Sequence, residues 1–324
     1  MSASPFDTAL TRQLGIALPI VGGAMYPCSN PELVAAVSEA GGIGVLQPIS
    51  LTYVHGYDYR GGIRRIRALT TKPIGMNALI EQSSKTYAQR MAKWIDVALE
   101  EGVRFFVTSL GNPRWVVERV GKVGGVVYHD VTERKWALKG RDAGVHGLIA
   151  VNSQAGGHAG PRDPRRLYEE LADLGLPVVC AGGVSDAATF RAALAIGYAG
   201  VQMGTRLIAT AECTASADYK QAIVEASPED IVLTERLTGV PVAVIRNEYV
   251  ERIGTKAGPI ARWMLRGRKT KHWMRTIYAL TSLRKLKHSL HTARGRDDYW
   301  QAGRSVAGIT EVLPVAEVIR RMTA

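Results

Sequence analysis

The stretch Gly147-Leu148-Ile149-Ala150-Val151-Asn152-Ser153-Gln154-Ala155-Gly156-Gly157-His158-Ala159-Gly160-Pro161-Arg162 decides how the chain is interpreted. Its first six residues form an apolar run that is typical of a buried strand. The run ends in glycines and a lone histidine, and glycine fills no core. Glycines let a backbone lie close to a flat ligand, and a histidine exchanges a proton near neutral pH. A surface turn fits this stretch equally well, so the rest of the chain must decide.

Eight apolar runs recur through the first two thirds of the chain, and their starts lie 20 to 32 residues apart. This spacing leaves room for one helix after each strand, which is the βα rhythm of a parallel sheet. The runs are nearly continuously apolar, as strands buried on both faces are. They cover residues 19–24, 42–47, 73–80, 103–110, 123–131, 145–152, 177–184 and 199–208.

The segments between these runs carry helix signals. Asn30-Pro31-Glu32 opens one helix with a cap residue, a proline in the first turn and an acid. Further helices are expected at residues 84–101, 163–174 and 185–197. Eight strands with intervening helices predict an α/β fold, the (β/α)8 TIM barrel. The alternative is an open doubly wound sheet, but its GxGxxG fingerprint is missing after the first strand.

The βα rhythm breaks at residues 254–303. A shorter helix is expected at residues 259–265, followed by a longer amphipathic helix with a basic far face. Apolar residues of the longer helix step by three or four positions: Trp273, Ile277, Leu280, Leu283, Leu286 and Leu290. We therefore expect a barrel over residues 1–253, a basic helical excursion over 254–303, and a closing segment with a helix over 304–324.

The net charge of +12 is concentrated in one segment. Residues 252–296 contain 13 Lys and Arg and no acid, so this segment carries +13 and leaves −1 for the rest. An acidic CoA or acyl-carrier partner would suit it. Nucleic acid or an anionic membrane surface is the alternative, but no nucleic-acid motif is present and the aromatic residues fall at helical spacing. A solvated basic face is therefore preferred, and nucleic acid is not expected.

Several classes of protein are excluded by composition. At 46% hydrophobic and 22% charged residues, the chain is an ordinary folded protein. It has no signal pattern at residues 1–12 and no apolar run of about 18 residues, so neither export nor a membrane span is expected. Cys28, Cys180 and Cys213 form no CxxC pair, which favours a cytoplasmic location and no metal site. A homo-oligomer stays open.

Polar and small residues gather where the strands end. In such barrels the active site lies at the C-terminal ends of the strands, and phosphate commonly sits between the last two loops. Those loops hold Gly182-Gly183 and Gly204-Thr205, whose bare amides and hydroxyl suit an anion. Gly23-Ala24-Met25 lets a planar ring approach the first strand, and a buried Asn77 needs a partner. A cofactor with a ring and a phosphate fits this rim.

With these motifs in order, the chain resembles the nitronate monooxygenase family. Its members are FMN-dependent barrel enzymes, formerly called 2-nitropropane dioxygenases and related to the flavin-dependent enoyl-ACP reductases. The resemblance covers nearly the whole chain. It rests on Pro19-Ile20, Gly41-Gly42-Ile43-Gly44, Ala155-Gly156-Gly157-His158-Ala159-Gly160, Ala181-Gly182-Gly183, Gln202-Met203-Gly204-Thr205-Arg206 and Ala307-Gly308.

The resemblance implies FMN as cofactor and a role for each matching residue. His158 matches the catalytic histidine, and His129 falls about where relatives carry a flavin-contacting basic residue. The remaining implied contacts are Gly23, Ala24 and Met25 against the isoalloxazine ring, Asn77 on the flavin, Gln154, Gly156 and Gly157 at its border, and Gly182, Gly183, Gly204 and Thr205 on the phosphate.

The implied activity is oxidation of an alkyl nitronate by dioxygen to a carbonyl compound and nitrite. His158 would hydrogen-bond the nitro oxygens or, when neutral, remove the α-proton of a nitroalkane. The alternative is an NAD(P)H-dependent FMN reductase of an enone, a quinone, or an enoyl thioester of CoA or an acyl carrier. Gln154 replaces an acid that is common in relatives, and Gly23-Ala24-Met25 replaces an Ala-Pro-Met triplet, so the substrate stays open.

Overall fold

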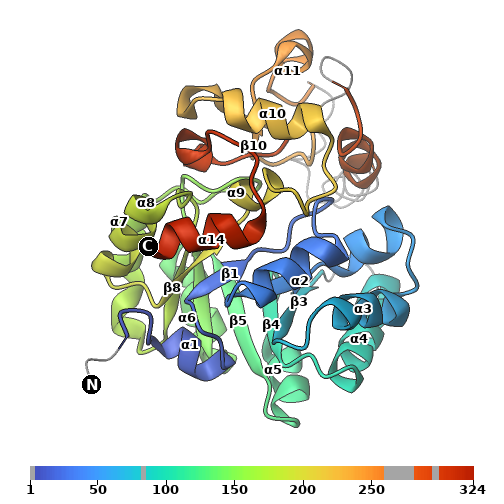
Figure 1. Cartoon of the computed structure of the whole chain (residues 1–324). Coiled ribbons are helices and arrows are strands. Elements are labelled where there is room, and N and C mark those ends of the chain that lie inside the picture. The colour runs from blue at the N-terminus through green and yellow to red at the C-terminus, as the bar shows by residue number, and fades with distance from the viewer. Residues whose placement is uncertain (1–3, 82–84, 259–280, 294–298) are drawn as a thin grey trace.

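The structure, a computed structural model, describes residues 4–81, 85–258, 281–293 and 299–324. Eight parallel strands form a closed barrel in chain order, because β1 pairs with both β2 and β8 (Figure 1). The predicted (β/α)8 barrel is confirmed, and the open sheet is wrong. The strands are β1 (Ile20–Gly22), β2 (Ile43–Leu46), β3 (Ile74–Leu79), β4 (Phe105–Ser109), β5 (Val126–Val131), β6 (Gly147–Val151), β7 (Val178–Ala181) and β8 (Gly200–Met203).

Helices cover the outside of the barrel, and their starts follow ordinary capping chemistry. Asp58, Asp163 and Asp186 each accept a hydrogen bond from a backbone amide in the first turn of the helix that follows. The helices are α2 (Pro31–Glu39), α3 (Tyr59–Leu69), α4 (Lys85–Glu100), α5 (Arg114–Gly121), α6 (Arg134–Asp142), α7 (Pro164–Leu171) with η2 (Ala172–Leu174), α8 (Ala187–Ile196) and α14 (Val315–Thr323), which packs against α2 and α8. Two smaller elements complete the barrel: α1 (Ala9–Leu14) at its base and η1 (Ser50–Val54) after β2.

Side chains alternate between the inside of the barrel and the helix layer. Val21, Val45, Phe105, Tyr128 and Ile149 form part of the inner cluster. The rings of Phe105 and Tyr128 meet edge to face with centroids 5.5 Å apart. Intervening strand residues pack outward against the helices. This period of two fixes which side chains can reach the mouth of the barrel.

One predicted strand is too long. The apolar run at residues 199–208 predicts a single strand, but β8 ends at Met203. Gly204 then leaves the extended conformation, and α9 (Thr205–Ile208) follows. A short buried helix is as apolar as a buried strand, so periodicity alone does not separate the two.

A second layer, here called the cap, lies over the C-terminal end of the barrel, while α1 lies at the other end (Figure 1). Its elements are α10 (Ala217–Glu225), η3 (Pro228–Asp230), the antiparallel pair β9 (Ile231–Thr234) and β10 (Val242–Ile245), α11 (Glu248–Ile253), and a helix at residues 281–289, before the chain returns through η4 (Arg304–Gly308). Val244, Leu286 and Tyr299 belong to its separate apolar core.

The cap begins earlier than the helical excursion expected from Gly254, since β9, β10 and α11 precede that residue. The end of the expected amphipathic helix agrees with the structure, where Leu286 and Leu290 are buried. The expected helix at 259–265, together with Trp273, Ile277 and Leu280, lies outside the described residues. Among the helices that are described, none has the length and hydropathy needed to cross a bilayer.

Gly44 tests the packing of α2 on the barrel. A Cβ at this position would lie 2.0 Å from the backbone oxygen of Val34 in α2, so the helix would have to move. We expect Gly44→Ala to lower the free energy of unfolding by about 3 kcal/mol. Gly121→Ala is the matched control, because no atom lies within 4 Å of the position that its Cβ would take. Urea denaturation of both variants checks this, and equal free energies would contradict the packing argument.

Candidate active site

Three polar side chains enter the C-terminal mouth of the barrel from different strands. Asn77 of β3, Asp130 of β5 and Gln202 of β8 occupy the inward-facing positions, because the residues on either side of each one pack outward with the helices. Each carries a buried oxygen that has no hydrogen-bond partner among the residues the structure describes: Asn77 Oδ1, Asp130 Oδ1 and Gln202 Oε1. Buried polar atoms are normally paired, so three orphans at one mouth indicate a ligand site.

The ends of β1 and β8 meet at this mouth. The amide of Gly23 donates to the carbonyl of Met203 at 2.9 Å. A Cβ at Gly23 would lie 3.1 Å from Cγ of Gln202, and one at Gly204 would lie 3.4 Å from Sδ of Met25. The structure therefore brings Gly23-Ala24-Met25 beside Gly204, in agreement with the grouping expected from the sequence.

The loops after β6 and β7 are joined by a side chain that sequence reasoning does not single out. Asn152 is fully buried, donates through Nδ2 to the carbonyl of Gly182 at 3.0 Å, and accepts the amide of Gln154 at 2.8 Å. Gly182 and Gly183 have φ values of +116° and +81°, which glycine adopts without strain. A buried amide at the end of an apolar run is the signal in the sequence that could have identified it.

The glycine-rich loop after β6 is held by the cap and by the returning chain. The amide of Ala243 donates to the carbonyl of Gly157 at 2.8 Å. Gly156 faces Gly303, and a Cβ on Gly303 would lie 2.5 Å from the amide nitrogen of Gly156. Gly303 also donates to Oγ1 of Thr205 at 2.9 Å. The predicted ring-border and phosphate residues thus share one framework.

His158 projects from this loop toward the cap. Its Nε2 lies 3.3 Å from Oγ1 of Thr238, and that hydroxyl donates to the carbonyl of Val240 at 3.0 Å. Because the hydroxyl of Thr238 already donates its proton to Val240, it can only accept a hydrogen bond from His158. The hydrogen of the neutral imidazole is therefore on Nε2, and Nδ1 is an acceptor. The ring reaches solvent at the mouth, yet desolvation by the surrounding protein lowers the pKa of His158 below its ordinary value. The neutral imidazole prevails at pH 7.

His129 does not join the other predicted residues. It is the outward-facing neighbour of Asp130, and its ring packs against Gly140 of α6 with Nδ1 2.9 Å from Oγ1 of Thr108. Burial lowers the pKa of His129 to about 4, so it is neutral and carries no charge toward the mouth. The inward position on β5 belongs to Asp130, the next residue along the strand.

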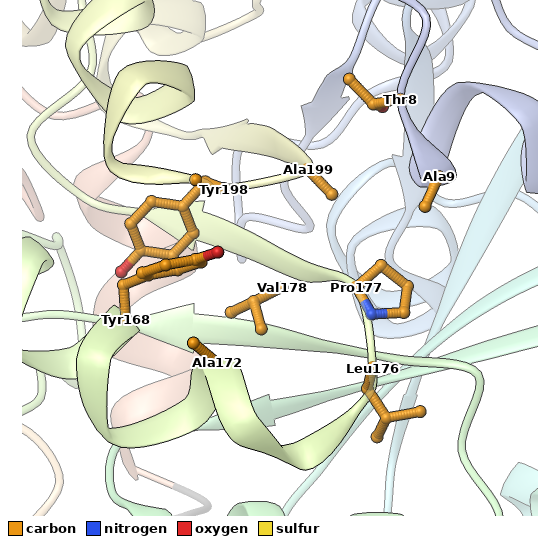
Figure 2. A pocket seen from close by; sticks show the side chains of 10 residues that line it. Thr8, Ala9, Tyr168, Ala172, Leu176, Pro177, Val178, Tyr198 and Ala199 are labelled. Carbon is orange, nitrogen blue, oxygen red and sulfur yellow. The ribbon is translucent and has the colours of Figure 1, made fainter.

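A cavity of about 340 Å³ lies at the opposite end of the barrel (Figure 2). Thr8, Tyr168, Val178, Tyr198 and Ala199 are among its lining residues; Val178 begins β7, and Tyr198 and Ala199 directly precede β8. It is therefore remote from the mouth. No group of three metal-ligating side chains occurs among the described residues.

Comparison with known proteins finds matches over nearly the whole chain. The family model for nitronate monooxygenase matches residues 7–324. A (3aS,4S,5R,7aS)-5-hydroxy-7a-methyl-1-oxo-octahydro-1H-indene-4-carboxyl-CoA dehydrogenase of Rhodococcus jostii is 31% identical over 262 residues, covering 80% of this chain and 72% of that protein. A nitronate monooxygenase of Pseudomonas aeruginosa is 29% identical, covering 96% and 97%. The structure of FabK from Thermotoga maritima superposes with a TM-score of 0.78 at 28% identity, covering 97% and 94%.

Gly303 tests how the loop after β6 is held. We expect Gly303→Ala to speed amide hydrogen exchange across residues 154–158 and to lower the free energy of unfolding by about 1–3 kcal/mol, because its Cβ collides with backbone. Gly258→Ala is the control, since no atom of the described residues would lie within 4 Å of its Cβ. Exchange mass spectrometry reads out both variants, and unchanged exchange in Gly303→Ala would show that the contact does not restrain the loop.

Proposed function

The chain belongs to the nitronate monooxygenase family, and from this premise we propose that it is an FMN-dependent oxidoreductase acting on a CoA thioester. The observation that carries the cofactor assignment is the set of three unpartnered buried oxygens at one mouth, bordered by glycine turns. The basic sequence of residues 252–296 and the relative that is named for a CoA compound support the substrate class.

The residues at the mouth fit FMN. Asn77 and Gln202 would share the polar edge of the ring, each amide either accepting the single ring N–H or donating to a ring carbonyl, and Gly23-Ala24-Met25 offers a close backbone edge. Thr205 accepts from Gly303, so its own O–H stays free to donate to a phosphate. The turns at Gly182-Gly183 and Gly204 would supply amides, since α9 begins without a side-chain cap. Bound FMN supplies the electron transfer.

His158 would handle the proton. Thr238 fixes the tautomer with hydrogen on Nε2, which leaves Nδ1 to take a proton from the reacting carbon or oxygen of a substrate. The lowered pKa keeps this nitrogen unprotonated near pH 7. Gly156 and Gly157 beside it lack side chains, so a flat cofactor and a substrate can both approach the ring.

The CoA thioester is proposed from charge and from relatives. Residues 252–296 carry +13, and within the described part Arg284, Lys285 and Lys287 lie on the cap helix at 281–289. The ammonium group of Lys287 donates to the carbonyl of Tyr53, beside the end of β2, so this helix borders the mouth side of the barrel. Phosphates of CoA would be attracted to such a surface. The Rhodococcus jostii relative is itself named as a CoA-thioester dehydrogenase.

Oxidation of nitronates with dioxygen is the second candidate. The family description and the Pseudomonas aeruginosa relative favour it. A neutral His158 is also the form that would remove the α-proton of a nitroalkane.

The two candidates predict different reductants for the bound flavin. Anaerobic protein is mixed in parallel with a hydroxyacyl-CoA, an enoyl-CoA plus NADH or NADPH, and an alkyl nitronate, while flavin absorbance is followed. We expect a CoA thioester to change the redox state, with a rate that falls as salt screens the phosphates. The matching pantetheine thioester, which has none of the CoA phosphates, should react more slowly. Bleaching by the nitronate alone would overturn the CoA assignment and support the second candidate.

His158→Asn tests the proton-transfer role. We expect turnover to fall by about 10²-fold with flavin still bound, because Asn keeps a hydrogen bond but cannot act as a base. In the wild type, kcat/KM for the proton-abstraction direction should rise with pH through a pKa below the ordinary histidine value and then stay level, since the neutral ring is active. His158→Asn should show no such rise of kcat/KM with pH. Wild-type turnover in flavin-loaded His158→Asn would exclude this role.

A further inference from the structure

We propose that Asp130 is a flavin-contacting residue whose carboxyl group hydrogen-bonds the polar edge of the isoalloxazine ring and couples proton uptake to flavin reduction. The inference rests on the proposed FMN site but not on the choice of substrate. It also replaces His129 by its neighbour as the β5 residue that faces the cofactor.

The position of Asp130 is set by the alternation of β5. Val126 and Tyr128 belong to the inner cluster of the barrel, whereas Val127 and Val131 pack outward with the helices. Asp130 therefore points inward at the last layer before the mouth. On β6 it pairs with Ile149, and on β4 it lies one residue beyond the pair formed by His129 and Thr108.

The carboxyl group is unsatisfied where it stands. Its Oδ1 is buried and finds no hydrogen-bond partner in the described part of the chain, like the oxygens of Asn77 and Gln202 at the same mouth. A buried carboxyl without a partner is costly, and the cost disappears when a ligand provides a donor or an acceptor. A flavin ring edge carries an N–H donor between carbonyl acceptors, so it can satisfy either protonation state.

Burial also brings the pKa of the Asp130 carboxyl close to neutral pH. It raises the pKa of Asp130 to about 7, and no charged neighbour contributes to that shift. The adjacent inward positions are Val107 and Ser109 on β4 and Ile149 and Val151 on β6, none of which ionises near neutral pH. Along β5, His129 faces outward, and the Tyr128 hydroxyl is bonded to Gln13 at 2.9 Å. His158 is the ionisable group that the β6 loop brings to the same mouth.

This environment has a definite consequence for the cofactor. Reduction adds negative charge to the ring, which disfavours an ionised carboxylate beside it and raises the pKa of that carboxyl. Across the pH range between its two pKa values, Asp130 should take up a proton when the flavin is reduced. An outward carboxyl, or a merely structural one, would leave the flavin potential unaffected.

The test follows the flavin itself. The midpoint potential and absorption spectrum of FMN-loaded protein are recorded from about pH 5 to about pH 9, a range that spans ordinary histidine and perturbed carboxyl titrations. Near neutral pH, the midpoint potential of the wild type should fall more steeply with pH than that of Asp130→Asn. The difference in slope should correspond to one additional proton taken up per two electrons. Asp130→Asn should keep FMN, whereas Asp130→Ala should bind it about tenfold more weakly because a hydrogen bond is lost.

Two control variants show whether a change in the slope of potential against pH is specific to Asp130. Asp142→Asn removes an exposed carboxyl at the end of α6, which is paired with Arg141, and should leave the slope as in the wild type. His129→Gln should do the same if the outward placement is right. Identical slopes in wild type and Asp130→Asn, with FMN affinity unchanged in Asp130→Ala, overturn the proposal. A wild type that holds no flavin overturns this proposal and the cofactor assignment together, while one that holds FMN but ignores CoA thioesters overturns the substrate assignment alone.

Discussion

The junction of β1 and β8 is the constraint on which the site depends. The Gly23 amide reaches the Met203 carbonyl, so the first and last strands close the barrel. Closure places a bare backbone edge next to the turn at Gly204, two regions that are about 180 residues apart in sequence. It also aligns the strand ends so that their polar side chains converge on one mouth. An open sheet with the same strands would separate these groups.

Much of the fold could be predicted from the sequence, because buried parallel strands are continuous apolar runs with a regular spacing. The same continuity explains what was missed on β5. A run without alternation gives no sign of which residues face inward, so His129 and Asp130 could not be told apart. The stagger between strands decides which alternate residues face the inside of the barrel, and this stagger is a property of the closed sheet. Asn152, Thr238 and Gly303 were missed because their roles are contacts between distant segments.

The barrel and the cap contribute different parts of the proposed site. Over most of its length the chain is similar to relatives that are named for different activities, a CoA-thioester dehydrogenase and a nitronate monooxygenase. In redox chemistry of that kind the cofactor carries the reaction, and the protein has to hold the cofactor's ring and phosphate and a basic side chain in a fixed arrangement. The cap contributes Thr238, the hydrogen-bond partner of His158. Fold and family therefore indicate the type of chemistry more strongly than they indicate the molecule transformed.

The contact between His158 and Thr238 joins the barrel and the cap. The barrel provides the imidazole, but the cap provides the oxygen that determines which ring nitrogen carries hydrogen. A substitution at position 238 would therefore change the hydrogen-bonding environment of His158 while every residue of the barrel stays as it is.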